Sequence, residues 1–213
     1  MYKTLWKERM REIKYNFLHW GPWVCHYQLS SEEIESLNKL EEGEDFRKGL
    51  AGHLKDEYRL DKTRVFTILL PYLNSYAQGV FDYRRVKLPN GFDLRSAWIN
   101  RQKKNEFNPP HNHSGLYAFV VWMKIPYSSE EQKKLKFLDG LKDVDKKAGD
   151  FEFVYTNLLG DISNYRYPMS PELEGTIILF PAQFMHCVYP FYDCDEPRIS
   201  LSGNLMISPT SVY

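Results

Sequence analysis

A nearly continuous apolar run constrains the fold of this chain more than any other feature. Residues 116–125 read Leu-Tyr-Ala-Phe-Val-Val-Trp-Met-Lys-Ile, and the run is too short to cross a membrane as a helix. Its β-branched and aromatic residues predict instead a strand that is buried on both faces. The chain must therefore build at least one sheet that is covered on both sides.

Strand patterns fill the rest of the C-terminal part of the chain, whereas the first 90 residues favour helices. We expect helices from Ser31 to about Leu40, over Glu44–Leu54, and from Arg64 to about Tyr83, where Pro71 should bend or split the helix. Residues 1–20 suggest a short helix or an irregular arm, residues 23–28 a short strand, and residues 157–173 a loop. The other predicted strands are Phe92–Gln102, Phe151–Thr156, Gly175–Phe180, His186–Tyr189 and Arg198–Ile207.

These patterns predict an α+β, mainly β chain that forms a single domain over residues 1–213. Residues 1–90 would be a helical N-terminal support, and residues 91–213 an antiparallel β core. The segment 127–150 is rich in Lys, Glu and Asp and would be a lid-like insertion that determines substrate choice.

Charge and cysteine content limit the partners and the compartment. The chain has 28 basic and 28 acidic residues, and this balance argues against a nucleic-acid-binding surface. Three cysteines without a CxxC spacing argue against a disulfide framework or a structural zinc site, which favours a reducing, cytoplasmic environment. The N-terminus lacks the apolar core of a signal peptide, and no run is long enough for a membrane span.

A pair of histidines, His111 and His113, is the first candidate for chemistry. On an extended chain, side chains at i and i+2 project to the same face, so the two imidazoles could bind one metal ion. By itself, the pair could equally be two strand histidines on a solvated face. Apart from the distal His186, the remaining histidines stand in ordinary helical or aromatic contexts and are expected to have ordinary surface or core roles. They are His19, His26 and His53.

Two downstream elements strengthen the metal hypothesis. The spacing from Gly175 through Pro181 to His186 is similar to the second motif of cupin and double-stranded β-helix metalloproteins. On the last predicted strand, alternation places the polar residues on one face, where a guanidinium fork could bind a carboxylate and a hydroxyl could add a donor. That polar face comprises Arg198, Ser200, Ser202 and Asn204. Seen alone, Arg198 could also form a surface salt bridge with the acidic residues before it.

Together these motifs resemble the Fe(II)- and 2-oxoglutarate-dependent oxygenases over roughly residues 92–207. The Asn-Pro-Pro-His-Asn-His-Ser-Gly stretch at 108–115 and the Trp-Met-Lys-Ile-Pro strand at 122–126 are most similar to oxygenases of marine cyanobacterial phages. The resemblance implies a double-stranded β-helix (a cupin-like jelly roll). It also implies hydroxylation of an unidentified substrate with O₂, with succinate and CO₂ as co-products. A phage protein of this kind would act in the host cytoplasm.

The resemblance also assigns roles to residues. It implies that His111, His113 and His186 bind Fe(II), and that Arg198 and Ser200 bind the far carboxylate of 2-oxoglutarate. Asn100 and Asn204 are further candidates for hydrogen bonds to that ligand or to the substrate, and Phe180 is a candidate for the pocket wall.

The sequence departs from the family pattern at His113, where the family has Asp or Glu. Iron could be held by three histidines, the interpretation we favour because strand geometry delivers His111 and His113 together. Alternatively, a water or one of Glu106, Asp150 and Glu152 could complete the site, or the domain could have lost catalysis. Two other functions therefore stay open: a three-histidine cupin dioxygenase that does not use 2-oxoglutarate, and a non-catalytic metal-binding β-barrel.

Overall fold

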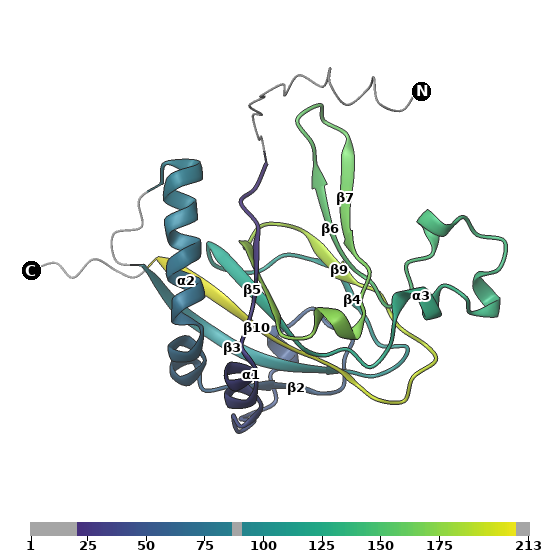
Figure 1. Ribbon diagram of the computed structural model, residues 1–213, viewed down its shortest axis with the longest axis horizontal. Helices are drawn as coiled ribbons and strands as arrows, with labels where there is room; N and C mark the ends of the chain where they lie inside the picture. The colour runs from purple at the N-terminus through teal and green to yellow at the C-terminus, as the bar shows by residue number, and fades with distance from the viewer. Residues whose placement is uncertain (1–20, 87–90, 208–213) are drawn as a thin grey trace, which may run out of the picture.

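Two facing antiparallel sheets form the body of the protein (Figure 1). The computed structural model describes residues 21–86 and 91–207, so the arm expected at residues 1–20 lies outside the described residues. In the six-stranded sheet the strand order is β1-β8-β5-β10-β3-β2, and in the four-stranded sheet it is β4-β9-β6-β7. The predicted mainly β, jelly-roll architecture is confirmed.

The predicted strands form with bounds close to those expected, and β2, β4 and β7 form in addition to them. The six-stranded sheet contains β1 (Cys25–Gln28), β2 (Glu57–Arg59), β3 (Phe92–Gln102), β5 (Tyr117–Lys124), β8 (Thr176–Pro181) and β10 (Arg198–Ile207). The four-stranded sheet contains β4 (Asn108–His111), β6 (Phe151–Thr156), β7 (Ile162–Tyr167) and β9 (His186–Val188).

Strand β5 shows why the apolar run is buried on both faces. Phe119 and Val121 belong to one hydrophobic core, which also contains Leu69 and Leu73 of helix α2 (Lys62–Arg84). Val120 and Trp122 alternate with them and belong to a second core that packs between the two sheets. The two sides of the six-stranded sheet are thus covered by different layers.

The first and the last of the three predicted helices form in the N-terminal part. Helix α1 (Ser31–Asn38) begins with the expected capping box of Ser30 and Glu33. Helix α2 is capped by Asp61 and runs through Pro71 without being split. The buried residues Leu69 and Leu73, on either side of the proline, pack against the sheet and offset the one backbone hydrogen bond that Pro71 cannot donate.

The helix predicted over residues 44–54 is wrong. Only a short 3₁₀ helix, η1 (Arg47–Gly49), forms there. The backbone before it forms hydrogen bonds with β2 instead. The amides of Gly43 and Phe46 donate to the carbonyls of Arg59 and Glu57, at 2.8 and 2.9 Å. This hairpin-like pairing satisfies the backbone groups that a helix would have used, and it turns residues 49–57 toward the body of the protein.

The loop predicted over residues 157–173 is also partly wrong, since β7 lies inside it. The Asn157 side chain accepts hydrogen bonds from the amides of Leu159 and Asp161, at 2.9 and 3.0 Å, and so closes a tight turn between β6 and β7. The resulting hairpin projects beyond the rest of the two sheets (Figure 1). A further 3₁₀ turn, η4 (Pro171–Leu173), follows it.

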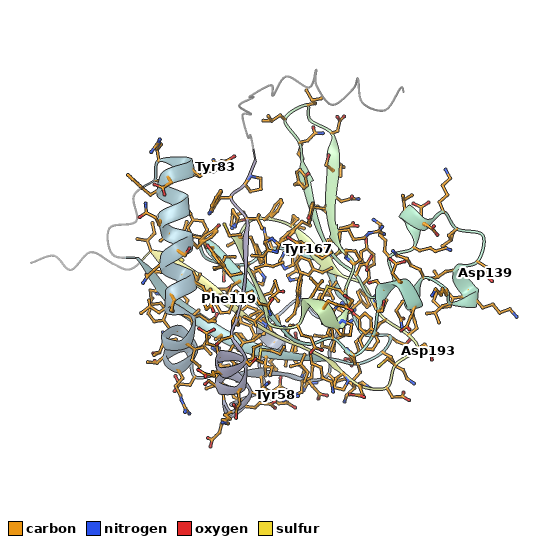
Figure 2. All side chains as sticks on the ribbon, in the orientation of Figure 1. Tyr58, Tyr83, Phe119, Asp139, Tyr167 and Asp193 are labelled. Atoms are coloured by element: carbon orange, nitrogen blue, oxygen red, sulfur yellow. The ribbon has the colours of Figure 1, made fainter. Side chains whose placement is uncertain are left out.

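The segment 127–150 folds into short helical pieces at the periphery. It contains α3 (Ser129–Gln132), η2 (Lys136–Leu138) and η3 (Asp143–Asp145). Figure 2 shows Asp139 at the edge of the molecule, away from Phe119 in the core. None of the helices within residues 21–86 and 91–207 is both long and apolar enough to span a membrane.

Candidate active site

A cavity of about 200 Å³ lies between the two sheets and contains the predicted site residues. The three histidines come from β4, β9 and the turn after β4, whereas the polar faces of β3 and β10 form the opposite wall. The polar face predicted for β10 is therefore confirmed: Arg198, Ser200, Ser202 and Asn204 all line the cavity.

The three histidines converge on one point. One ring nitrogen from each of His111, His113 and His186 lies within 4.8 Å of the other two, a spacing that could hold a metal ion. His111 and His186 are register partners across β4 and β9, and their ring centroids are 4.3 Å apart. His113 lies beyond the end of β4, where its amide donates to the carbonyl of Ala182 at 2.8 Å. That backbone bond, rather than strand alternation alone, brings His113 beside His186.

Hydrogen bonds fix the ring orientation of two of these histidines. Nδ1 of His111 lies 2.7 Å from the carbonyl oxygen of Pro109, and Nδ1 of His186 lies 3.0 Å from that of Phe184. A carbonyl oxygen can only accept, so each Nδ1 must carry the proton, which leaves the lone pair on Nε2. This arrangement is the one in which an imidazole binds a metal ion through Nε2.

Burial also keeps the three rings uncharged. Desolvation lowers the pKa of His111, and desolvation together with the neighbouring His111 lowers the pKa of His113 to about 3. The pKa of His186 is lowered well below its ordinary value for the same reasons. Neutral imidazoles are the protonation state that metal binding requires, so the donor set fits a divalent metal such as Fe(II).

The three carboxylates that were considered as alternative ligands have other partners. Glu106 accepts from the amides of Lys55 and Lys103, at 3.2 and 2.8 Å. Asp150 accepts from Ser129, and Glu152 pairs with Lys147 at 3.0 Å. Among the described residues, the only group of His, Cys, Asp or Glu side chains with metal-binding spacing is the histidine group.

Arg198 lies at one end of the cavity wall as a buried cation. It is 5% exposed, and its Nη1 donates to the Tyr127 hydroxyl at 2.9 Å and to the Gly149 carbonyl at 3.2 Å. Its Nη2 donates to Gln102 Oε1. No carboxylate of the described residues pairs with it, so the salt bridge considered from the sequence does not form. A buried guanidinium without a counterion is suited to an anionic ligand.

The other polar residues of this wall are arranged along β3 and β10. Asn100 Nδ2 donates to Ser200 Oγ at 3.3 Å, and Asn204 Nδ2 donates to Ser96 Oγ and Ser114 Oγ, each at 3.3 Å. The Oδ1 atoms of both asparagines are buried without a hydrogen-bond partner. Asn100 therefore lies beside the arginine end of the wall, whereas Asn204 lies at the opposite end of β10.

Among the lining residues that sequence reasoning missed is the one acidic side chain of the cavity wall within the described residues, Glu57. Its register partner is Asn100, so both side chains project to the same face of the sheet, and Glu57 lines the cavity with an exposed fraction of 1%. Strand β2 has three residues, too few for an alternation pattern to be recognised, and a helix was predicted directly before it. No sequence signal singles this residue out.

The burial of Glu57 should make the stability of the folded protein depend on pH. Burial, followed by the nearby charge of Glu106, raises its pKa to about 7. Between its ordinary value of 4.5 and about 7, the folded protein retains a proton that the unfolded chain has released, so the stability contribution of Glu57 falls as pH rises through that window.

Replacing Glu57 with Gln should therefore stabilise the ligand-free protein at alkaline pH. After allowance for screening by solvent in the cavity, we expect a gain of about 2 kcal/mol at pH 8 and of less than about 1 kcal/mol at pH 5. Urea unfolding of both proteins at the two pH values measures the difference. An equal effect at both pH values would mean that the carboxyl is not desolvated.

Comparisons with known proteins agree with this site. The family described as "Putative 2OG-Fe(II) oxygenase" matches residues 96–204. No curated protein sequence matches the chain. Among solved structures, an oxidoreductase of the 2OG-Fe(II) oxygenase family from Burkholderia pseudomallei is similar, with a TM-score of 0.53, 14% identity, and coverage of 85% of this chain and 84% of that one.

Two further structures share the fold. The viral collagen prolyl hydroxylase of Paramecium Bursaria Chlorella virus-1, solved with 2OG, has a TM-score of 0.51, 12% identity, and coverage of 87% of this chain and 96% of that one. The non-heme alpha ketoglutarate dependent epimerase SnoN has a TM-score of 0.51, 14% identity, and coverage of 89% and 82%. These likenesses confirm the double-stranded β-helix, and the family match covers all three histidines and most of β10. The chain belongs to the 2OG-Fe(II) oxygenase family, whose members use Fe(II) and 2-oxoglutarate.

Proposed function

We propose that His111, His113 and His186 hold Fe(II) in this oxygenase, and that Arg198 and Ser200 bind the far carboxylate of 2-oxoglutarate. The reaction is the hydroxylation of an unidentified substrate, with succinate and CO₂ as co-products. The observation that carries the assignment is the buried, unpaired Arg198 in the same cavity as three neutral imidazoles. The histidine group suits a metal ion, and Arg198 suits a carboxylate. The keto-acid end of 2-oxoglutarate can bind the metal while its far carboxylate binds the arginine.

The histidine group supports a metal centre with three imidazole ligands. The carbonyl partners of His111 and His186 leave both Nε2 lone pairs free, and His113 is the remaining nitrogen donor within the 4.8 Å group. Three facial protein ligands leave coordination positions free for a keto-acid and oxygen. Because imidazole is neutral, such a centre carries one more positive charge than a centre with a carboxylate ligand.

The residues around the cavity position the ligand and exclude water. Gln102 and Tyr127 accept hydrogen bonds from the Arg198 guanidinium and hold it in place. The guanidinium is therefore preorganised before a carboxylate binds. Phe180 and Phe151 pack against the His186 ring, at centroid distances of 5.2 and 5.4 Å, and form an apolar wall that keeps water from the metal side. When bound, Fe(II) and 2-oxoglutarate would supply the electrons that activate O₂, the oxidant, for C–H hydroxylation.

The insertion at residues 127–150 supports a proposal of a mobile lid. Its two ends supply Tyr127 and Gly149, both of which accept hydrogen bonds from Arg198. A shift of the insertion would therefore change the contacts of the residue that binds 2-oxoglutarate. In this structure the insertion contributes no side chain to the cavity wall, which instead includes residues 49–57 of the N-terminal part.

The relation to oxygenases of marine cyanobacterial phages also remains a proposal. It is supported by residues 108–115, which contain two of the proposed iron ligands, and by residues 122–126. On this proposal the enzyme would act in the cytoplasm of an infected host.

The proposed function is tested by 2-oxoglutarate turnover. Purified protein with Fe(II) should form succinate from 2-oxoglutarate and O₂ even without a substrate, at the slow rate of uncoupled turnover, and a chelator should abolish the product. Mass spectrometry of succinate measures both. A protein that consumes O₂ with an added substrate but releases no succinate would instead be a three-histidine dioxygenase. A protein that binds no iron would be a non-catalytic β-barrel.

A further inference from the structure

A carboxyl group without an ion-pair partner among the described residues, that of Glu57, lies in the wall of the cavity that also contains Arg198. Both oxygens of Glu57 are buried without a hydrogen-bond partner. The charged groups that act most strongly on its pKa are Glu106, then Arg47 and Asp45. Arg47 is an exposed side chain that forms its salt bridge with Asp45. Two of these three groups are acidic, and no cation of the described residues forms an ion pair with Glu57; Arg198, on the same wall, donates to Gln102, Tyr127 and Gly149 instead.

The neighbouring cation on β2 has a partner of its own, and a glycine makes room for the Glu57 carboxyl. On β2, the next cation is Arg59, which pairs with Glu44 at 2.6 Å and lies over the Phe46 ring, 3.9 Å from its centroid. A Cβ at Gly52 would lie 2.8 Å from Glu57 Oε1, so the glycine is what makes room for the carboxyl. Burying a carboxylate without a hydrogen-bond or ion-pair partner lowers the folding stability of the ligand-free protein.

An aromatic residue of the same wall, Trp98, is the diagonal neighbour of Glu57 in the sheet. Trp98 is two residues before Asn100 on β3, so it is the diagonal cross-strand neighbour of Glu57 on the same face, and it lines the cavity. A carboxylate together with an indole ring is a combination that binds organic cations, through an ion pair and a cation–π contact. A neutral donor would leave the charge of Glu57 uncompensated, whereas a cation would neutralise it.

We propose that Glu57 is the substrate-recognition residue of this oxygenase, and that the substrate presents an ammonium or guanidinium group that binds between Glu57 and Trp98. The inference rests on the proposed function, because it treats the cavity as the substrate site of a 2-oxoglutarate-dependent enzyme. A cavity of about 200 Å³ must also take the co-substrate, so only an end group or a single side chain of the substrate enters it.

The experiment compares two probes of the same length on the complete Fe(II)- and 2-oxoglutarate-loaded protein under argon. The probes are n-butylammonium and n-butanol, and binding is followed by calorimetric titration. We expect the wild-type protein to bind n-butylammonium at least tenfold more tightly than n-butanol. Glu57→Gln, which keeps the shape but not the charge, should abolish this preference and leave the affinity for n-butanol unchanged.

A matched variant separates the site from general electrostatics. Glu44→Gln removes one exposed negative charge from the segment that pairs with β2, and it should retain the tenfold preference. Equal binding of the two probes by the wild type, or a preference that survives in Glu57→Gln, would overturn the proposal. The same samples are titrated with 2-oxoglutarate beforehand: if 2-oxoglutarate does not bind, the proposed function fails, and if it binds without any cation preference, only the role of Glu57 fails.

Discussion

Replacing Arg198 with Ala should weaken the binding of 2-oxoglutarate by at least about 100-fold. The guanidinium is buried and has no carboxylate partner, so it would form its ion pair with the ligand out of contact with water. Removing one partner of a buried ion pair costs about 3–5 kcal/mol, and each 1.4 kcal/mol is a factor of ten in affinity. The measurement is the KM for 2-oxoglutarate in succinate formation, together with the dissociation constant under argon.

Two further variants make the Arg198 result specific. Arg198→Lys keeps the charge but loses the planar fork, and its affinity should lie between those of the wild type and the alanine variant. Arg101→Ala removes a neighbouring arginine on β3 that only forms a partly exposed salt bridge with Glu42, and it should leave the KM unchanged. Circular dichroism checks the fold of each variant. An unchanged KM in a folded Arg198→Ala protein would mean that this arginine does not bind the co-substrate.

Loss of one proposed iron ligand should have a comparable effect on metal binding. His186 is the most buried of the three, and its ring packs against Phe151, Phe153 and Phe180. Mutation of a residue that merely orients a ligand costs 10–100-fold in metal affinity, so His186→Ala should cost more than about 100-fold. His26→Ala, on β1 and outside the cavity, is the control and should bind iron like the wild type.

His113 distinguishes the possible ligand sets. If three imidazoles hold the iron, His113→Ala should lose affinity as His186→Ala does, whereas His113→Asp should keep the metal through a carboxylate. Metal analysis of protein reconstituted without oxygen measures the bound iron per chain. Full iron content in His113→Ala would show that the third ligand is a water or another side chain.

The site was predictable from the sequence where it depends on regular strands. The period-2 alternation of β10 places Arg198, Ser200, Ser202 and Asn204 on the face that lines the cavity, and the same alternation on β3 places Asn100 on one face with Trp98 and Gln102. Local patterns suffice here, because a strand fixes the direction of every side chain along it.

Features that depend on contacts distant in sequence could not be predicted in the same way. Residues 44–54 have helical periodicity, but their backbone pairs with β2, which is itself held by β3 far along the chain. Glu57 enters the cavity only through that pairing. The convergence of His113 on His186 likewise depends on a backbone hydrogen bond to Ala182, in a turn that the spacing of the motifs does not describe.

The most direct test of the central claim is a titration of 2-oxoglutarate into the Fe(II)-loaded protein under argon, followed by visible absorption. Chelation of Fe(II) by a keto-acid produces a charge-transfer band, which neither component shows alone. We expect the band to grow and saturate at one 2-oxoglutarate per chain in the wild type, and to be absent from His186→Ala. Wild-type protein that binds one iron but develops no band, or a band of full intensity in His186→Ala, would contradict the assignment of this cavity as the iron and 2-oxoglutarate site.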